Sequence, residues 1–507
     1  MTESLYTLLE SRFPADRTKV LLETDAGTRF TYGEAEAAAT RMARALADRG
    51  VKAGDRVAVQ VDKSPAALFL YLACLRAGFV FLPMNTAYRP DEVDYLVGNA
   101  EPAAVICRPA DEEIVRGIAD RHGTPLVLTL DADGAGSLAD AAAEAPADFP
   151  VAACAADDLA AMLYTSGTTG KPKGAMLTQR NLAANGLDLV ESWRFTADDV
   201  LLHALPIFHA HGLFVACHCV LLAGASMLWL PGFDRASVIR LLPRATTFMG
   251  VPTFYTRLLD GDDFDRDVCA GMRLFTAGSA PLLAETHEAF EARTGHAILE
   301  RYGMTETGML TGNPYDGDRR PGSVGVPFPR VEVRIADDQD RPLGRTEIGG
   351  IQVRGPNVMK GYWRLPEKTA EEFTADGWFR TGDVGRIDDR GYLFIVGRAK
   401  DLVISGGYNV YPKEVESVID ELPGVVESAV IGVPHPDFGE AVVAVVVPAA
   451  EGAPDEAAVI AHCKAHLANY KTPKRVFFVP ALPRNTMGKV QKAQLREQNA
   501  ALFAPVG

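Results

Sequence analysis

A glycine- and threonine-rich loop near position 170 carries the strongest chemical signal in the sequence. Residues 164–174 have the sequence YTSGTTGKPKG and lie between two apolar segments, DLAAMLY and GAMLT, that are typical of strands. The glycines let the backbone turn tightly and point N–H groups inward, while hydroxyls and lysines surround the same space. Such a loop suits a polyphosphate better than it suits a surface hairpin. It is not a Walker A loop, because Lys171 is followed by Pro172 where Ser or Thr is required.

Several residues elsewhere have side chains suited to a bound nucleotide. Glu306 offers the hard oxygen ligand that Mg²⁺ prefers, and Asp383, in a glycine-flanked turn, can accept hydrogen bonds from ribose hydroxyls. Tyr302 offers an aromatic face to a base, with residues 278–281 (GSAP) as a thin opposite wall. Lys489 follows a glycine in a C-terminal loop and can neutralise charge that develops during a reaction. Each residue alone would be an ordinary turn or surface residue, so the inference rests on their joint occurrence.

These segments resemble, in the same order along the chain, the motifs of the adenylate-forming superfamily of acyl-CoA synthetases, peptide-synthetase adenylation domains and luciferases. Residues 164–174 resemble the family's phosphate loop, and residues 302–307 (YGMTET) resemble its adenine and magnesium segment. Residues 381–383 (TGD) are similar to its ribose segment, and residues 397–401 (GRAKD) to its hinge. Residues 483–489 (PRNTMGK) are similar to the loop of its catalytic lysine. Ordered motifs over most of the chain make a chance match very improbable.

The resemblance implies a two-step reaction that uses ATP, Mg²⁺ and coenzyme A. A small carboxylic acid would first become an acyl-adenylate with release of pyrophosphate, and its acyl group would then pass to CoA. Lys489, Thr305 and Glu306 correspond to the family's catalytic residues, and Glu306 also corresponds to its metal ligand. The ATP-binding positions of the family correspond to Thr165, Ser166, Gly167, Thr168, Thr169, Gly170, Lys173, Gly278, Ser279, Ala280, Pro281, Tyr302, Gly303, Thr305, Asp383, Arg398 and Lys489.

The resemblance also implies that the C-terminal domain moves between the two steps. It would rotate about the hinge residue Lys400, which withdraws Lys489 and admits the CoA thiol. Gly406, Gly407 and Tyr408 would then line the channel for the pantetheine arm of CoA, where paired glycines permit close backbone approach.

Within the superfamily, the chain looks most like the malonyl-CoA synthetases, which also accept methylmalonate. A dicarboxylate needs its distal charge paired, because an unpaired buried carboxylate costs several kcal/mol. Arg235 is the first candidate, since the loop before it adjoins the acyl pocket in the family, although Gly232 stands where family members have a basic residue. The other arginines near the pocket segments are Arg257, Arg273 and Arg301.

The remaining residues expected around the acid are His209, Ser279 and Met304, with His211 as a weaker candidate. Other activities on the same machinery stay open. A short-chain or aryl monocarboxylate:CoA ligase would have a pocket without a cation. A domain that loads a carrier protein is less favoured, because no carrier-type serine motif follows Lys489. A non-catalytic nucleotide-binding or scaffold protein is disfavoured by the presence of all the candidate catalytic residues.

Strand and helix patterns predict an α/β fold with a large N-terminal domain of layered parallel sheets and covering helices. Residues 56–85, for example, have the pattern of a strand–helix–strand unit. From about residue 320, short strands predict an antiparallel or β-barrel-like subdomain, and a small α+β domain follows it. We expect an N-terminal domain of residues 1–397, a hinge at 398–401 and a mobile C-terminal domain of residues 402–507.

Composition argues against polymeric anions as partners. The 507 residues include 51 Lys and Arg against 66 Asp and Glu, so the net charge of −15 disfavours nucleic acid and anionic membranes. No apolar run reaches membrane-spanning length, and the N-terminal segment lacks a secretory pattern. The cysteines form no CxxC pair, and Cys217-His218-Cys219 lies in an apolar run that favours burial over zinc binding. We expect a cytoplasmic enzyme, either a monomer or a homodimer.

Overall fold

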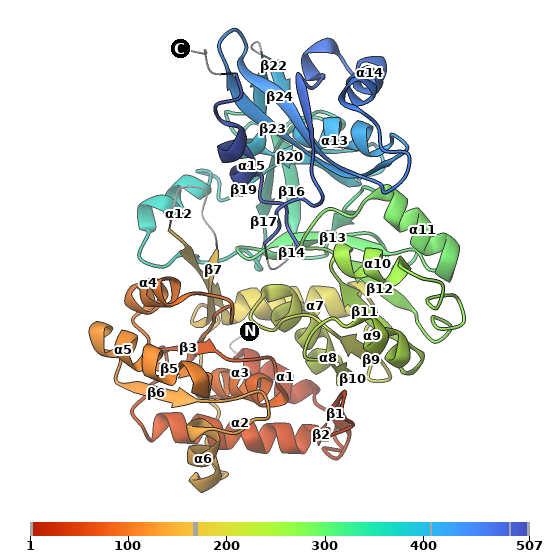
Figure 1. Cartoon of the computed structure of the whole chain (residues 1–507). Coiled ribbons are helices and arrows are strands. Elements are labelled where there is room, and N and C mark those ends of the chain that lie inside the picture. Colours follow the sequence, from red (N-terminus) through yellow and green to blue (C-terminus); the bar gives the residue numbers. More distant parts are fainter. Residues whose placement is uncertain (1–3, 166–170, 406–407, 486–487, 504–507) are drawn as a thin grey trace. The chain divides into compact units, whose positions relative to one another are not determined.

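The computed structural model describes residues 4–165, 171–405, 408–485 and 488–503. The chain forms two compact units, whose elements are labelled in Figure 1. The first unit comprises Met1–Glu332 and Val353–Phe379, and the second comprises Val333–Gln352 and Arg380–Gly507. The predicted hinge at residues 398–401 lies within the second unit, and the predicted domain boundaries stay a prediction.

A seven-stranded sheet in the first unit confirms the predicted strand–helix–strand pattern. Its order is β18-β8-β7-β4-β3-β5-β6, with parallel pairing among β3 to β6 and an antiparallel β7–β8 pair. The helix α3 (Pro65–Ala77) begins after the N-cap Ser64 and ends at Gly78, whose positive φ suits glycine. The strands are β3 (Arg56–Gln60), β4 (Val80–Pro83), β5 (Ala104–Cys107), β6 (Leu126–Thr129), β7 (Leu159–Thr165), β8 (Lys173–Thr178) and β18 (Gly361–Tyr362).

A nine-stranded sheet in the same unit has the order β15-β14-β13-β12-β11-β9-β10-β1-β2. The neighbouring strands β13, β12, β11, β9, β10 and β1 run parallel to one another. The next strand, β14, reverses direction and pairs antiparallel with β13. The predicted parallel layers are therefore confirmed, and the carboxyl ends of β9, β11, β12 and β13 lie along one edge. The strands are β1 (Val20–Thr24), β2 (Arg29–Thr31), β9 (Val200–His203), β10 (Ser226–Trp229), β11 (Thr247–Gly250), β12 (Leu274–Ala277), β13 (Leu299–Met304), β14 (Gly308–Gly312) and β15 (Val326–Pro327).

Helices separate and cover these sheets. The helix α7 (Gln179–Ser192) contacts β7, β8 and β14, so it lies between the two sheets (Figure 1). The π-helix η2 (His211–Cys217) runs directly into α8 (His218–Ala223). The other helices of the first unit are α1 (Leu5–Arg12), α2 (Tyr32–Ala47), α4 (Pro90–Ala100), η1 (Pro109–Asp111), α5 (Glu112–His122), α6 (Ser137–Glu144), α9 (Arg235–Leu241), η3 (Leu242–Arg244), α10 (Pro252–Leu259), α11 (Ala284–Thr294) and α12 (Pro366–Glu372).

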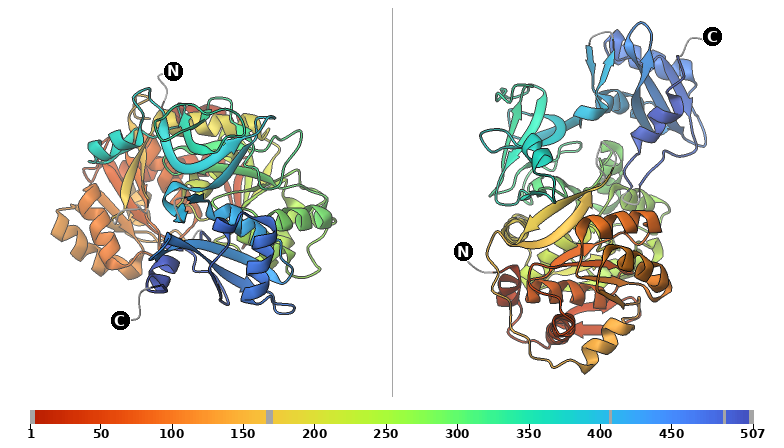
Figure 2. Two further views of the ribbon diagram at one scale, coloured as in Figure 1. Left: turned by 90° about the horizontal axis from the view of Figure 1, so that it is seen from above. Right: turned by 90° about the vertical axis from the view of Figure 1, so that its left-hand side faces the viewer.

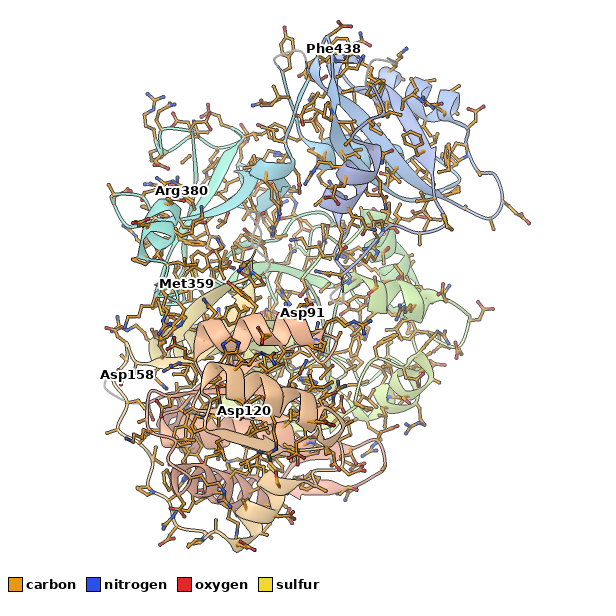
Figure 3. All side chains as sticks on the ribbon, turned by 60° about the vertical axis from the view of Figure 1, so that its left-hand side comes forward. Asp91, Asp120, Asp158, Met359, Arg380 and Phe438 are labelled. Atoms are coloured by element: carbon orange, nitrogen blue, oxygen red, sulfur yellow. The ribbon has the colours of Figure 1, made fainter. Side chains whose placement is uncertain are left out.

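The outer helices α4 and α5 show why the sequence forms this layer. Each turns an apolar face to the core, with Val93 and Ile118 buried against the seven-stranded sheet. Each exposes charged residues on its other face, among them Asp91 and Asp120 (Figure 3). Within the described part of the chain, no helix combines the length and apolar character needed to cross a bilayer.

The second unit contains two further sheets (Figure 2). The four-stranded sheet has the order β16-β17-β19-β20, and the five-stranded sheet has the order β22-β21-β24-β23 with β25 beside β24. The described helices of this unit are η4 (Ala399–Asp401), α13 (Pro412–Asp420), α14 (Glu456–His466), η5 (Asn469–Lys471) and α15 (Lys492–Asn499). The strands are β16 (Glu332–Ala336), β17 (Gly349–Arg354), β19 (Phe379–Ile387), β20 (Leu393–Arg398), β21 (Val403–Ser405), β22 (Tyr408–Val410), β23 (Val425–His435), β24 (Gly439–Pro448) and β25 (Arg475–Phe478).

The apolar strand β24 explains the core of the predicted α+β domain. Val442 and Val446 belong to one buried cluster, and Val443 and Val445 belong to a second cluster on the opposite face. A strand that is buried on both faces has a continuous apolar sequence rather than an alternating one. The predicted small α+β region is therefore confirmed.

The cysteines have the structural role that was predicted. All seven are free and buried. His218, between Cys217 and Cys219, forms a hydrogen bond of 2.8 Å between its Nε2 atom and the hydroxyl of Tyr71. Among the described residues, no group of three or more His, Cys, Asp or Glu side chains could hold a metal ion.

Substitution of Phe275 in β12 tests how much core packing stabilises the first unit. Phe275 is fully buried and packs edge-on against Phe248, Phe290 and His296. We expect Phe275→Ala to lower the free energy of unfolding by about 3–5 kcal/mol, because lost burial and a residual cavity both destabilise. Urea unfolding monitored by circular dichroism measures this change. Ile114→Ala, at a side chain that is 52% exposed, should stay within about 0.5 kcal/mol of the parent, and equal effects of the two substitutions would contradict the prediction.

Candidate active site

Arg301 is a buried cation in the middle of β13. It is 4% exposed, and within the described part of the chain its Nε and Nη2 atoms have no hydrogen-bond partner. Burial lowers its pKa to about 9, and among the described residues the ionisable group that opposes this effect is Tyr255, not a carboxylate. The guanidinium therefore stays charged at neutral pH with donor atoms unused. Such a group favours an anionic ligand that can pair with it.

A glycine at position 278 makes room for this guanidinium. Gly278 follows β12, which is the neighbour of β13 in the sheet. A Cβ atom at this position would lie 2.3 Å from Cζ of Arg301, so any larger residue would displace the arginine. The next residue, Ser279, has a φ of 72°, a left-handed conformation that is uncommon outside glycine. The segment predicted as a wall beside adenine thus begins directly against Arg301.

His211 contacts both His209 and Ser279, which are two of the residues predicted to bind the substrate. The backbone N–H of His211 donates to Nδ1 of His209 over 3.2 Å, and Nδ1 of His211 lies 3.2 Å from Oγ of Ser279. Burial and then Arg301 lower the pKa of His209 to about 4 and hold the pKa of His211 well below its usual range. Both rings are therefore neutral at neutral pH, which leaves Arg301 as the charge beside them.

Lys63 is a second basic residue in this region, which the sequence analysis missed, and burial lowers its pKa to about 7. Its Nζ atom lies 2.8 Å from Nδ1 of His203, donates to the His203 carbonyl over 2.9 Å, and is 4.4 Å from the Trp229 ring centroid. Nε2 of His203 in turn lies 2.9 Å from the carbonyl oxygen of Gly212, in the π-helix η2 that begins at His211. The signal for Lys63 was its place just after the carboxyl end of a parallel strand, where ligands bind in α/β sheets.

The structure does not bring Arg235 together with these groups. Its guanidinium pairs with Asp263 and donates to the carbonyls of Arg257 and Leu258. Arg273, another arginine noted in the sequence, pairs with Asp199 over 2.7 Å. Both already have carboxylate partners, whereas Arg301 has none among the described residues.

The predicted phosphate loop connects β7 to β8. Thr165, the last residue of β7, is paired with Lys173, the first residue of β8. Nζ of Lys173 lies 3.5 Å from Oε1 of Glu372 and 4.0 Å from the ring centroid of Tyr362. The other loop residues predicted to bind phosphate lie outside the described residues: Ser166, Gly167, Thr168, Thr169 and Gly170.

The predicted magnesium ligand Glu306 lies in the turn between β13 and β14, after Met304 and Thr305. Its carboxyl group is buried and accepts a hydrogen bond of 3.1 Å from the hydroxyl of Tyr362. Mg²⁺ in nucleotide sites is held by one or two carboxylates together with phosphate oxygens. A lone buried carboxylate fits that arrangement, because the nucleotide would supply the remaining ligands.

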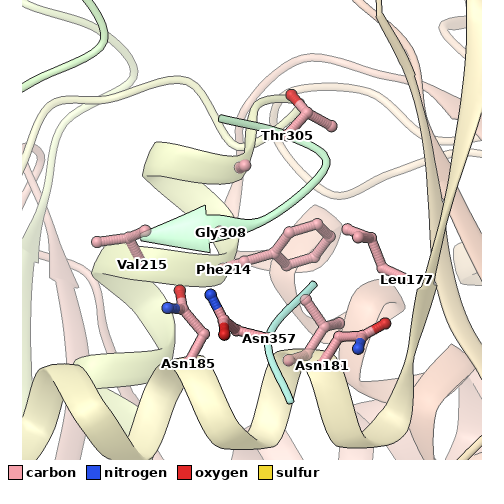
Figure 4. A pocket seen from close by; sticks show the side chains of 10 residues that line it. Leu177, Asn181, Asn185, Phe214, Val215, Thr305, Gly308 and Asn357 are labelled. Carbon is pink, nitrogen blue, oxygen red and sulfur yellow. The ribbon is translucent and has the colours of Figure 1, made fainter. Parts of the chain in front are cut away.

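Buried asparagines hold this turn in place around a small cavity (Figure 4). Asn185 of α7 donates to the Met309 carbonyl over 2.9 Å and accepts from the Met309 N–H over 3.1 Å. Asn357 donates to the Thr307 carbonyl over 2.8 Å. Gly308, with a φ of 60°, passes so close to Asn185 that a Cβ atom would lie 2.6 Å from its Oδ1. Sequence analysis did not identify these asparagines, because they hydrogen-bond to backbone groups that are distant along the chain.

The adenine residues predicted from the sequence lie at the ends of neighbouring strands. Tyr302 and Gly303 belong to the last half of β13, and Tyr302 is buried. Ala280 and Pro281 follow Ser279 in the segment between β12 and α11. Because β12 and β13 run parallel, these two segments leave the sheet at the same edge.

In the second unit, four predicted residues form a charged cluster. Nε of Arg398 lies 3.1 Å from Oδ1 of Asp383, and the two residues stand opposite each other in the β19–β20 pair. Burial and then Arg398 lower the pKa of Lys489 to about 8, while Asp383 opposes this effect. Burial and Arg398 also lower the pKa of the predicted hinge residue Lys400. The structure thus brings the predicted ribose, hinge and catalytic residues of this unit together.

The predicted CoA segment is described only in part. Gly406 and Gly407 lie outside the described residues. Tyr408 is 60% exposed, and its ring stacks on Tyr470 with the ring centroids 4.8 Å apart. Tyr470 is partly buried, so the exposed ring of Tyr408 is the part of this pair that can receive an apolar or planar part of a ligand.

Comparison with known proteins places these features in a family. A model of AMP-binding enzymes matches residues 10–363, and a model of the AMP-binding enzyme C-terminal domain matches residues 414–489. A feruloyl-CoA synthase of Amycolatopsis sp is 39% identical over 93% of this chain and 94% of the relative. A mitochondrial malonate–CoA ligase of Mus musculus is 37% identical over 89% of this chain and 83% of the relative.

A solved structure shares the fold closely. The structure of ATP-bound MatB from Rhodopseudomonas palustris is 56% identical, with a TM-score of 0.97, and the match covers 99% of this chain and 100% of that chain. The predicted resemblance to adenylate-forming enzymes, with malonate–CoA ligases among the relatives, is therefore confirmed. The chain belongs to the AMP-binding enzyme family and, within it, to the acyl-CoA ligases.

Proposed function

We propose that the chain is an ATP-dependent acid:CoA ligase whose acid carries a second negative charge, with malonate as the substrate and methylmalonate as a related one. The observation that carries this proposal is Arg301, which is buried, charged and without a carboxylate partner among the residues that the structure describes. The malonate–CoA ligase among the relatives supports the same choice of acid.

The energetics of Arg301 favour a dicarboxylate over a monocarboxylate. A buried guanidinium with unused donors is unfavourable, and a carboxylate that reaches it recovers both charge pairing and hydrogen bonds. His209 and His211 are neutral and can donate or accept hydrogen bonds without competing for that charge. An uncharged acyl tail would leave the arginine unpaired, so the pocket would select against it.

The residues of the first unit would bind the nucleotide. We assign the triphosphate to the loop from Thr165 to Lys173, and the adenine to Tyr302 and the 278–281 segment. Glu306 would hold Mg²⁺ together with the phosphates, and this ion would supply positive charge to the phosphoryl oxygens.

Two displacements make up the reaction. In the first, a carboxylate oxygen of the acid attacks the α-phosphorus of ATP, which forms acyl-AMP and releases pyrophosphate. In the second, the CoA sulfur attacks the acyl carbonyl, the thiol proton is lost, and AMP leaves with its electron pair. We assign charge neutralisation in the first step to Lys489 and the ribose contact to Asp383. Lys400 would act as the hinge between the steps, and Tyr408 would contact CoA.

An aryl acid is the second candidate. A feruloyl-CoA synthase is among the similar relatives, at 39% identity over nearly the whole chain. A pocket for such an acid would need an aromatic slot, and a buried cation would weaken binding of an uncharged ring. Substrate comparison separates the two candidates directly.

Arg301 is expected to determine the preference for a second carboxylate. CoA-dependent AMP formation with malonate, methylmalonate, propionate, acetate and ferulate should rank malonate first. Arg301→Met should lower kcat/KM for malonate about 100-fold, because the distal carboxylate would lose its buried partner, while propionate should change little. The matched control is Arg235→Met, since Arg235 already pairs with Asp263. A larger loss with Arg235→Met, or a parent enzyme that prefers ferulate, would reject the assignment.

The adenylation step is expected to lose rate as the pH rises above about 8, the pKa to which burial and Arg398 lower Lys489. The charged form of the lysine exists below that pKa, and it is the charged form that neutralises the α-phosphate. ATP–pyrophosphate exchange measured from pH 6.5 to 10 should therefore fall by about tenfold per unit well above the pKa.

Lys489→Arg is the control for this pH profile. An arginine keeps its charge throughout this range, so its exchange rate, although lower, should stay flat above pH 8. The same alkaline fall in Lys489→Arg would assign the titration to another group and contradict the prediction.

A further inference from the structure

Tyr362 contacts two residues that the proposed function assigns to Mg²⁺ and the phosphates, Glu306 and Lys173. Its hydroxyl donates a hydrogen bond of 3.1 Å to Oε1 of Glu306. The Nζ atom of Lys173 lies over the face of its ring, 4.0 Å from the centroid. Tyr362 itself is 4% exposed. One buried side chain therefore connects the end of the phosphate loop with the turn that carries the proposed magnesium ligand.

The backbone around Tyr362 is fixed on both sides. Tyr362 stands opposite Ala175 in the antiparallel β18–β8 pair, and the next N–H, of Trp363, donates to the carbonyl of Gly174 over 2.8 Å. On the other side, the N–H of Met359 donates to the carbonyl of Glu306 over 2.8 Å. Residues 359–363 thus connect the strand that returns from the phosphate loop to the turn after β13.

A further hydrogen bond fixes the residue itself. The backbone N–H of Tyr362 donates to Oγ1 of Thr369 over 2.9 Å. With its backbone held at both neighbours and its ring buried, the side chain has little freedom to change rotamer. A rigid side chain can hold two partners at a constant separation.

Each of the two contacts of Tyr362 suits the charge of the group that it touches. Burial, then Glu306 and Glu372, raise the pKa of the Tyr362 hydroxyl far above its usual range, so the hydroxyl keeps its proton and acts as a donor. A donor to one carboxylate oxygen fixes the orientation of that carboxylate, which is the usual arrangement around metal ligands. The ring face attracts the Lys173 ammonium, which also lies 3.5 Å from Glu372.

We propose that Tyr362 is a positioning residue that sets Glu306 and Lys173 relative to each other, so that Mg²⁺ and the phosphates of ATP are received as one unit. This inference rests on the proposed function, since it takes Glu306 and Lys173 as the groups that face the metal and the phosphates. Tyr362 itself touches neither the acid nor the reacting atoms in this assignment. Its loss should affect the contribution of Mg²⁺ to nucleotide binding more than the binding of ATP alone.

Calorimetric titration of ATP, with Mg²⁺ or with EDTA, tests the inference without relying on turnover. The parent enzyme should bind ATP more tightly with Mg²⁺. Tyr362→Phe keeps the ring and removes the hydroxyl. The factor by which Mg²⁺ raises the affinity for ATP should therefore shrink about tenfold, while the affinity for ATP in EDTA should stay within about twofold of the parent. Tyr362→Leu also removes the ring face under Lys173, so it should weaken binding in EDTA as well.

Tyr32→Phe is the matched control. The Tyr32 hydroxyl is fully buried and donates to the Ala225 carbonyl over 2.7 Å, with no contact to Glu306 or Lys173. The Tyr32→Phe variant also loses a buried hydroxyl, but the gain in ATP affinity that Mg²⁺ provides should stay unchanged. A double substitution with Glu306→Gln provides a further measurement, since Tyr362→Phe should then have no additional effect if it acts through Glu306.

The possible results distinguish a failure of the proposed function from a failure of the positioning role of Tyr362. If the parent enzyme binds no ATP under either condition, the proposed function fails. If the parent binds ATP with a clear gain from Mg²⁺ and Tyr362→Phe keeps that gain in full, the positioning role of Tyr362 is rejected while the proposed function stands. Additive losses in the double substitution would also reject it, because they would mean that Tyr362 does not act through Glu306.

Discussion

A charged guanidinium that is buried without a carboxylate from any described residue is the constraint on which the proposed acyl site depends. Arg301 lies in the buried strand β13 and is only 4% exposed, and in the described structure two of its nitrogen atoms have no hydrogen-bond partner. Keeping such a group is unfavourable for folding, so its presence indicates a ligand that pairs with it. Gly278 leaves the space that the guanidinium occupies, and the histidines beside it are held neutral.

The sheet explains why the candidate residues gather where they do. In a parallel sheet the carboxyl ends of neighbouring strands leave at one edge, and polar residues placed there meet although they are distant in sequence. His203 ends β9, Gly278 follows β12, and Met304 ends β13. The antiparallel turn into β14 then places Glu306 beyond the end of the parallel strands.

Segments from distant parts of the chain fix the turns at this edge. Asn185 and Asn357 satisfy the backbone of residues 307–309, and Tyr362 contacts Glu306 and Lys173. The Asn185 amide bonds both the carbonyl and the N–H of Met309, and the Asn357 amide donates to the carbonyl of Thr307, so these side chains favour one conformation of the turn over its alternatives. A binding site built on loops can be rigid when each loop is tied to another element in this way.

The sequence by itself determined the parallel α/β layers, the small α+β region and the membership of a superfamily. These features could be predicted because hydrophobic periodicity and motifs such as residues 164–174 and 302–307 depend only on residues that are close together in the sequence. The sequence also marked Lys489, Glu306 and Asp383 as candidates, whose roles remain proposals. Only the tertiary structure distinguished Arg301 from Arg235, because the difference lies in partners: Asp263 approaches Arg235 from a separate segment, and no described carboxylate approaches Arg301. Burial and pairing depend on residues brought together by folding, and neither is encoded in the spacing of one segment.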